Sequence, residues 1–155
     1  MLTLLTLSLF SLGLLSCSST PNIYKSTELD SVKELKTGQK IVYYSSDEGL
    51  ATYLKLRLEA EIPVIDSKYD IRSLPVTFYI IPTYQDWKNY YGYRNTIFGI
   101  AYSRFDIYDV FVLATSQYKF AGDQYANCNI SHTGFSAATG YENHVKRLVA
   151  KQQKQ

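Results

Sequence analysis

The stretch LPVTFYIIP, residues 74–82, decides the fold. Val76, Phe78 and Ile80 alternate in it with Thr77, Tyr79 and Ile81, and a proline stands at each end. Runs of β-branched and aromatic residues bounded by turn residues are typical of strands. The stretch therefore predicts a central strand with Phe78 in the core.

Two elements are predicted immediately upstream. Residues 40–45 contain the run Ile41-Val42-Tyr43-Tyr44, which predicts a second strand. A helix is predicted from Asp47 to Ile62, because Leu50, Leu54 and Leu58 recur at every fourth position. Ser45 and Glu48 have the spacing of a capping box at its start, and Pro63 is expected to end it. Leu54 is expected to face the sheet.

Further elements are predicted on both sides of this unit. Residues 29–35 favour a short helix, and Thr83 is a natural N-cap for a helix over residues 84–91 that ends at Gly92. The aromatic residues of that helix, Tyr84, Trp87 and Tyr91, share one face and are interpreted as core. Residues 97–102 and 110–114 predict two strands that can form a hairpin, and residues 142–151 predict a C-terminal helix. Residues 115–135 give no clear pattern.

These elements predict an α+β fold, with a mixed or antiparallel sheet of about four strands packed against two or three helices. Residues 29–155 are long enough for one domain, and a hydrophobic content of 46% with 15% aromatics is sufficient for a core. The net charge of +2 gives no argument for nucleic-acid binding. The fifteen tyrosines fit half-buried strand positions, and alternatively a tyrosine-lined binding face.

The N-terminus resembles the signal peptide of a bacterial lipoprotein. Residues 1–15 contain no charged residue, and Leu14-Leu15-Ser16-Cys17 has the form of a lipobox. The apolar run is shorter than the roughly 20 residues of a membrane span and suits a signal h-region, although the n-region lacks Lys or Arg. We therefore expect residues 1–16 to be removed and Cys17 to carry lipid such as palmitate. The alternative is an ordinary cleaved signal with a cysteine there by chance.

Lipidation would anchor the protein to a membrane of the cell envelope without spanning it. Residues 17–28 then form a lipidated N-terminus and a Ser/Thr-rich tether. Ser18 follows the cysteine, and resemblance to enterobacterial lipoproteins then implies the outer membrane.

The chain offers few residues for catalysis or metal binding. With Cys17 acylated, Cys128 has no partner and is expected to be buried. A zinc site of Cys128, His132, Glu142 and His144 can be drawn, but its spacing matches no known pattern. We therefore expect no catalytic residues, no metal and no cofactor.

Residues 38–113 resemble the N-terminal part of peptidase MA-like domains, which are zinc metallopeptidases of the gluzincin type. The resemblance rests on the order of the predicted elements. These are the strand Ile41-Val42-Tyr43-Tyr44, the helix over residues 50–62, the strand over residues 75–82, the helix over residues 84–91, and the segments Phe98-Gly99-Ile100-Ala101-Tyr102 and Val110-Phe111-Val112-Leu113. In that family an H-E-x-x-H motif on the next helix holds zinc. The corresponding stretch here is His144-Val145-Lys146-Arg147-Leu148, which lacks the glutamate and the second histidine.

Two functions follow from these observations. The first is a non-catalytic, lipid-anchored envelope protein that acts through surface contacts with a partner other than nucleic acid. The alternative is a truncated or degenerate peptidase MA-like metallopeptidase domain.

Overall fold

The computed structural model describes residues 29–91, 99–104 and 107–155. Its strands are β1 (Ser31–Glu34), β2 (Lys40–Tyr43), β3 (Val76–Ile81), β4 (Ile100–Arg104) and β5 (Ile107–Leu113). Its α-helices are α1 (Glu48–Tyr69), α2 (Tyr84–Tyr91), α3 (Tyr118–Ala121) and α4 (Ile130–Gln152). Short 3-10 turns occupy Ser45–Asp47, Thr115–Gln117 and Asp123–Tyr125.

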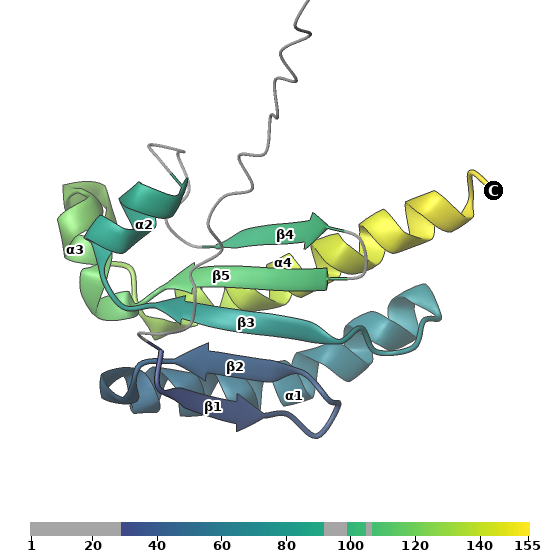
Figure 1. Cartoon of the computed structure of the whole chain (residues 1–155), viewed down its shortest axis with the longest axis horizontal. Helices are drawn as coiled ribbons and strands as arrows, with labels where there is room; N and C mark the ends of the chain where they lie inside the picture. The colour runs from purple at the N-terminus through teal and green to yellow at the C-terminus, as the bar shows by residue number, and fades with distance from the viewer. Residues whose placement is uncertain (1–28, 92–98, 105–106) are drawn as a thin grey trace, which may run out of the picture.

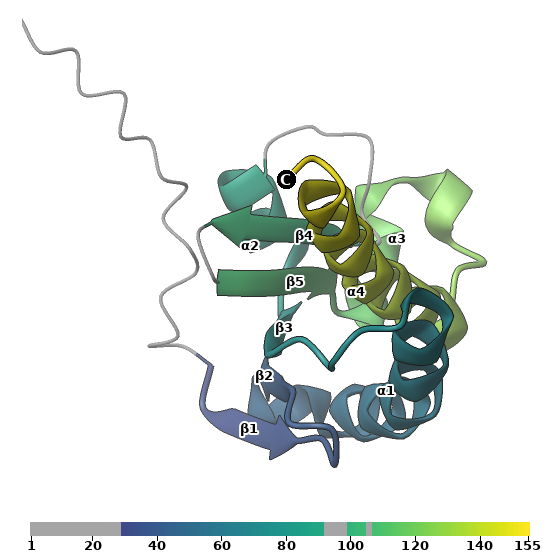
Figure 2. The same ribbon diagram turned by 90° about the vertical axis from the view of Figure 1, so that its right-hand side faces the viewer.

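The strands form one mixed sheet in the order β1-β2-β3-β5-β4 (Figure 1). β2, β3 and β5 are parallel, and the edge strands β1 and β4 run antiparallel to their neighbours. The long helices α1 and α4 pack side by side on one face of this sheet (Figure 2). The predicted α+β class with a mixed sheet is confirmed.

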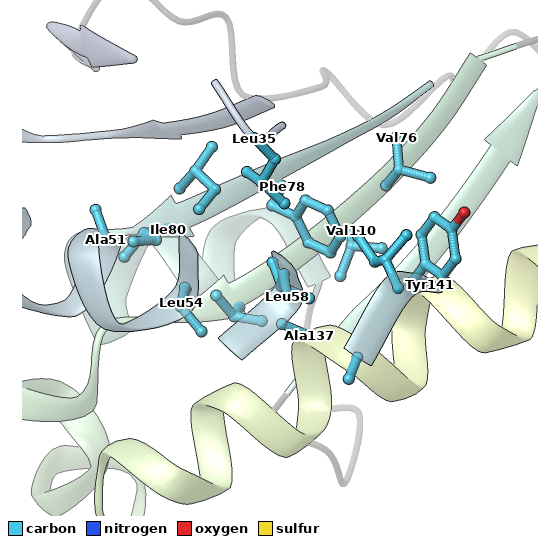
Figure 3. Close-up of a cluster of buried hydrophobic side chains, with 14 of the residues drawn as sticks. Leu35, Ala51, Leu54, Leu58, Val76, Phe78, Ile80, Val110, Ala137 and Tyr141 are labelled. Atoms are coloured by element: carbon cyan, nitrogen blue, oxygen red, sulfur yellow. The ribbon is translucent and has the colours of Figure 1, made fainter. Parts of the chain in front are cut away.

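The main core lies between the sheet and the pair α1 and α4 (Figure 3). Leu54 on α1 and Phe78 on β3 are fully buried in it, as the sequence predicts. Because strand side chains alternate between faces, Val110 and Val112 of β5 point into this core, whereas Phe111 and Leu113 point away from it. The opposite face carries a second, smaller cluster.

That second cluster lies toward one end of the sheet. It consists of Leu29, Ile81, Trp87, Phe111, Leu113 and Tyr118. Trp87 on α2 is buried in it, which confirms a core role for this aromatic residue. The Asp86 amide donates to Thr83 Oγ1 at 3.1 Å, so the predicted N-cap of α2 is also confirmed. Gly92 lies outside the described residues.

The helix predicted over residues 29–35 is wrong, because Ser31–Glu34 forms the edge strand β1. A tight turn joins it to β2, in which the Leu35 amide donates to the Gln39 carbonyl at 2.9 Å. Gly38 has φ +93° in this turn, a conformation that favours glycine. Pairing with β2 therefore overrides the local helical pattern of this segment.

The predicted end of α1 at Pro63 is also wrong, since the helix continues to Tyr69. Pro63 is exposed, so the interrupted hydrogen bond faces solvent, while Ile62 and Asp66 on the buried side keep the helix on the core. The helix ends at Asp70, whose φ of 50° is left-handed. Tertiary packing here outweighs a proline cost of about 3 kcal/mol.

The start of α1 also differs from the prediction, because no capping box forms there. Ser45 instead bonds Asp30, with its amide 2.8 Å and its hydroxyl 3.1 Å from the carboxylate. The Glu48 carboxylate accepts from Tyr43 Oη and pairs with Lys33 Nζ, each at 2.5 Å. Both side chains therefore connect the helix start to β1 and β2.

In the C-terminal half, the predicted types of element are correct but their predicted boundaries are not. The expected hairpin is present as β4 and β5, with Ala101 opposite Val110. The C-terminal helix, expected over residues 142–151, begins twelve residues earlier, at Ile130. Its first half carries Gly134 and Gly140, which are poor helix formers, and small alanines, and these residues permit close packing.

Candidate functional site

A groove of about 610 Å³ lies between α4, the segment that enters β4 and α1. α4 contributes most of its lining: Ser131, His132, Phe135, Ser136, Thr139, Gly140 and Asn143. Gly99 and Ala101 line the strand side, and Arg57 reaches in from α1. Figure 1 shows β4 at the edge of the sheet with α4 behind it.

The first turn of α4 fixes one end of the groove. The Asn129 side chain accepts from the Ser131 amide at 2.9 Å, and His132 Nδ1 accepts from the Asn129 amide at 3.1 Å. This reciprocal capping box satisfies backbone donors that the helix start leaves unpaired. His132 therefore has a fixed ring position while remaining exposed.

Arg57 ties the same end of the groove to α1. Its Nη1 donates to the Ser131 carbonyl at 3.2 Å and to Tyr53 Oη at 3.1 Å, and its Nε pairs with Glu61 at 2.7 Å. The hydrogen bond to Tyr53 and the pair with Glu61 raise the pKa of Arg57. The guanidinium is thus a permanently charged, oriented donor beside the helix start.

Glycines allow the groove walls to approach one another. A Cβ at Gly134 would lie 2.6 Å from Arg57 Cδ, and one at Gly140 would lie 2.7 Å from Val110 Cγ1. A Cβ at Gly99 would lie 3.1 Å from Ser136 Cβ. These contacts bring α4 against α1, β5 and the entry to β4, and so set the width of the groove.

The strand side of the groove is formed by the start of β4, which is an edge strand of the sheet. β4 pairs with β5 on one side only. The Ala101 carbonyl accepts a long hydrogen bond of 3.4 Å from Arg147 Nη1, so this carbonyl points away from β5. Arg147 is exposed and belongs to the last part of α4. An edge strand with outward carbonyls is a template for pairing with another strand.

The groove presents hydrogen-bonding groups and one aromatic ring. Hydroxyl and amide groups on α4, the Arg57 guanidinium and the His132 imidazole line it, and Phe135 adds an exposed aromatic ring. Its described lining contains no Asp, Glu or Cys. Among the described residues, no group of three or more His, Cys, Asp or Glu side chains could hold a metal ion.

The structure separates the four residues of the zinc site drawn from the sequence. His132 lines the groove, whereas His144 is 1% exposed in the core and its Nε2 lies 2.8 Å from the Asp109 carbonyl. Glu142 pairs with Lys68 at 2.8 Å on another side of α4. Cys128 is partly buried against the second cluster, so its expected burial is only partial.

His144 is also the first residue of the stretch that corresponds to the gluzincin zinc motif. Burial lowers its pKa, and its Nδ1 has no hydrogen-bond partner within the described part of the chain. Tyr108 packs edge-on against the ring, with centroids 5.4 Å apart. This histidine therefore acts as a neutral core residue that holds α4 on β5.

Sequence reasoning missed the polar groove residues Ser136, Thr139 and Asn143. They recur at i, i+3 and i+7, a stripe that would have been visible had the helix been assigned from residue 130. None of the described lining residues is a tyrosine, and Tyr118 and Tyr141 are core residues. Cys17 and the predicted segments 1–16 and 17–28 lie outside the described residues.

No protein-family model, curated protein or solved structure matches this chain. In the described ranges, no helix combines the length and the apolar character needed to cross a membrane.

Proposed function

We propose that this protein is a non-catalytic, lipid-anchored binding protein of the cell envelope, and that its groove receives an extended polypeptide segment of a partner. The observation that carries the proposal is the position of the groove, with the outer edge of β4 on one side and the polar stripe of α4 on the other. The lipid anchor on Cys17 and the outer-membrane location rest on the lipobox sequence.

An extended segment suits the strand side of the groove. A peptide that adds to a sheet edge gains main-chain hydrogen bonds, and pockets for its alternate side chains give specificity. The Ala101 carbonyl is directed outward and accepts a hydrogen bond from the exposed Arg147 at 3.4 Å. Such a long, exposed hydrogen bond is weak and can be exchanged for one from an incoming peptide amide.

The helix side of the groove suits the polar and negatively charged groups of a peptide. Ser136, Thr139 and Asn143 offer hydroxyl and amide groups, and Arg57 and His132 supply donors at one end. The described lining holds no carboxylate to oppose an acidic side chain or a C-terminal carboxylate.

Selection of random peptides on the purified protein tests the proposal. The wild-type chain should enrich peptides that no longer bind Thr139→Trp, a substitution that fills the groove. Lys55→Trp, at a partly exposed position on α1 that does not line the groove, is the matched control and should bind them normally. Equal binding by both variants would place the peptide site elsewhere, and cleavage of the selected peptides would show that the protein is an enzyme.

A further inference from the structure

The long helices α1 and α4 run toward the same end of the molecule. Arg57 on α1 donates to the Ser131 carbonyl on α4 at 3.2 Å, and further along both helices Lys68 donates to Glu142 at 2.8 Å. Each of these pairs is separated by 74 residues in the sequence, so the two helices are parallel and in step. α1 ends at Tyr69, whereas α4 continues for about nine residues, or about 14 Å, past that level. Figure 1 shows this part of α4 extending past the sheet.

Exposed cations collect where the two helices end, on the side of the molecule that faces the viewer in Figure 2. We call this surface the basic end, and its six residues are Lys68, Arg72, Lys146, Arg147, Lys151 and Lys154. The segments 67–73 and 142–155 contain these six basic residues and two acidic ones, a net charge of +4. The rest of the chain holds ten basic and twelve acidic residues, a net charge of −2. The positive charge of the chain is therefore concentrated at one end.

The two acidic residues of these segments neutralise the basic end only in part. Glu142 is shared between two ammonium groups, since it lies 2.8 Å from Lys68 Nζ and 3.7 Å from Lys146 Nζ. Asp70, the other acidic residue, is exposed and ends α1. Even with one cation assigned to each carboxylate, four positive charges of the basic end remain.

The helix dipoles account for part of this pattern. A cation in the last turn of a helix interacts favourably with the negative end of the dipole, and the effect falls off within that turn. Lys68 and Lys151 occupy the last turns of α1 and α4. Lys146 and Arg147 lie more than one turn before the end of α4, and Lys154 follows it. Helix stability therefore does not explain the whole cluster.

The shape of the basic end suits a fluid anionic surface. It is convex, because α4 extends past the sheet (Figure 1), and mobile lipid headgroups can gather around a convex cluster. Groups of four to eight Lys or Arg on a helix are typical of binding to anionic lipids. Single-stranded nucleic acids are instead held in grooves with exposed aromatic rings. Tyr69 at the basic end is half-buried, and the Lys68 ammonium lies 5.0 Å from its ring centroid.

We propose that the basic end docks on the anionic phospholipid headgroups of a bilayer. The contact is electrostatic and superficial, with the C-terminal end of α4 toward the membrane. The opposite end of the molecule, where α2 and α3 lie, then faces away from the bilayer (Figure 1). The proposal goes beyond the lipid anchor and holds whether or not Cys17 carries lipid.

Vesicle binding by residues 18–155 tests the proposal. This chain contains every described element and lacks the lipidation site, so its binding does not depend on the anchor. It should co-sediment with vesicles of equal amounts of phosphatidylcholine and phosphatidylglycerol, and not with vesicles of phosphatidylcholine alone. Salt should weaken the binding, because it screens charges at the surface. Equal binding to both kinds of vesicle, or to neither, would overturn the proposal.

A charge-matched pair of double variants locates the contact. Each Lys near an anionic surface raises the binding constant by roughly fivefold, so Lys151→Gln with Lys154→Gln should weaken vesicle binding by about tenfold or more. Both side chains are exposed, and the melting temperature should not change. Lys88→Gln with Lys119→Gln, on α2 and α3, removes the same charge and should bind nearly as the wild type does. Equal weakening by the two double variants would show that net charge, and not the basic end, causes the binding.

Heparin and a DNA duplex test whether the basic end serves another polyanion. Vesicle binding that persists in the presence of either competitor at equal charge concentration supports a lipid surface. Tight binding to heparin or to the duplex, without binding to the anionic vesicles, would overturn the proposal. Neither result bears on the peptide groove, which the first half of α4 lines and which the peptide selection tests separately.

Discussion

Tyr141 on α4 donates its hydroxyl hydrogen to Asp66 Oδ1 on α1 at 2.6 Å, and the same hydroxyl oxygen accepts the Leu74 amide at 3.0 Å. The tyrosine is fully buried and Asp66 is 8% exposed. Ser73 also donates to the Asp66 carboxylate. One phenol therefore joins the two long helices to the residue that leads into the central strand.

Tyr141→Phe should lower the free energy of unfolding by about 1–3 kcal/mol, because it leaves both the carboxylate and the Leu74 amide without this partner. Chemical denaturation measures the change. Tyr44→Phe, at an exposed tyrosine, is the matched control and should have little effect. A loss no larger than that of the control would show that water replaces the hydroxyl.

Truncation of the two predicted core residues should be strongly destabilising. Leu54→Ala should cost about 2–5 kcal/mol and Phe78→Ala about 3–5 kcal/mol, because both side chains are fully buried. Leu56 on the same helix is 65% exposed, and Leu56→Ala is expected to have little effect in thermal melts. Melting within a degree or two of the parent in both core variants would contradict this packing.

Gly140→Ala should destabilise the protein although alanine is the better helix former. The new Cβ would lie 2.7 Å from Val110 Cγ1, and overpacking of this kind costs about 1–3 kcal/mol. A Cβ at Gly49 in α1 would meet nothing within 4 Å, so Gly49→Ala should instead stabilise by up to about 1 kcal/mol. Val110→Ala should relieve part of the Gly140→Ala loss, and no relief would mean that the clash is elsewhere.

His144 should make stability fall in mildly acidic solution. Burial lowers its pKa in the folded protein below the ordinary value of 6.5, and the nearby Arg147 adds to this effect. The unfolded chain therefore binds the proton more readily, and stability should decline as the pH falls through 6.5. The slope due to one group is at most about 1.4 kcal/mol per pH unit.

Denaturation of the wild type and of His144→Gln between pH 7.5 and 5.5 isolates this contribution. His144→Gln should be less stable than the wild type at every pH in this range, but it should lack the decline in stability that comes from the titration of His144. Parallel curves for wild type and His144→Gln would show that His144 does not titrate in this range.

Cys17→Ala should abolish incorporation of labelled fatty acid and move the protein from the membrane to the soluble fraction. Cys17 is the only cysteine at a predicted processing site, and Cys128→Ala should retain both label and membrane attachment. Label persisting on Cys17→Ala would refute the lipobox assignment.

The sequence predicts the elements whose local pattern and tertiary environment agree. Alternation around Phe78 and the four-residue repeat around Leu54 both report a buried face, and both residues are fully buried. The errors arise where packing outweighs local preference. Pro63 lies within α1 because the hydrogen bond that it interrupts is on the solvent-exposed side of the helix. Ser31–Glu34 is a strand because β2 provides a hydrogen-bonding partner.

The candidate site is harder to predict from the sequence than the fold is. Its polar stripe lies on the half of α4 in which glycines obscure the helical pattern, and Arg57 reaches it from a helix 74 residues away from Ser131. The sequence offers His132 as a zinc ligand, but its position beside the β4 edge depends on the packing of α4. Long-range packing of this kind leaves no local signal.

The two edges of the sheet differ in a way that bears on self-association. β1 is four residues long and contains Lys33 and Glu34, a short and charged edge of the type that resists pairing between copies. The β4 edge borders the groove. A molecule with one edge open to strand pairing and one edge that resists it can accept a single strand from another protein. It offers no second edge to a third molecule, so strand addition would stop at a one-to-one complex and would not grow into a fibre.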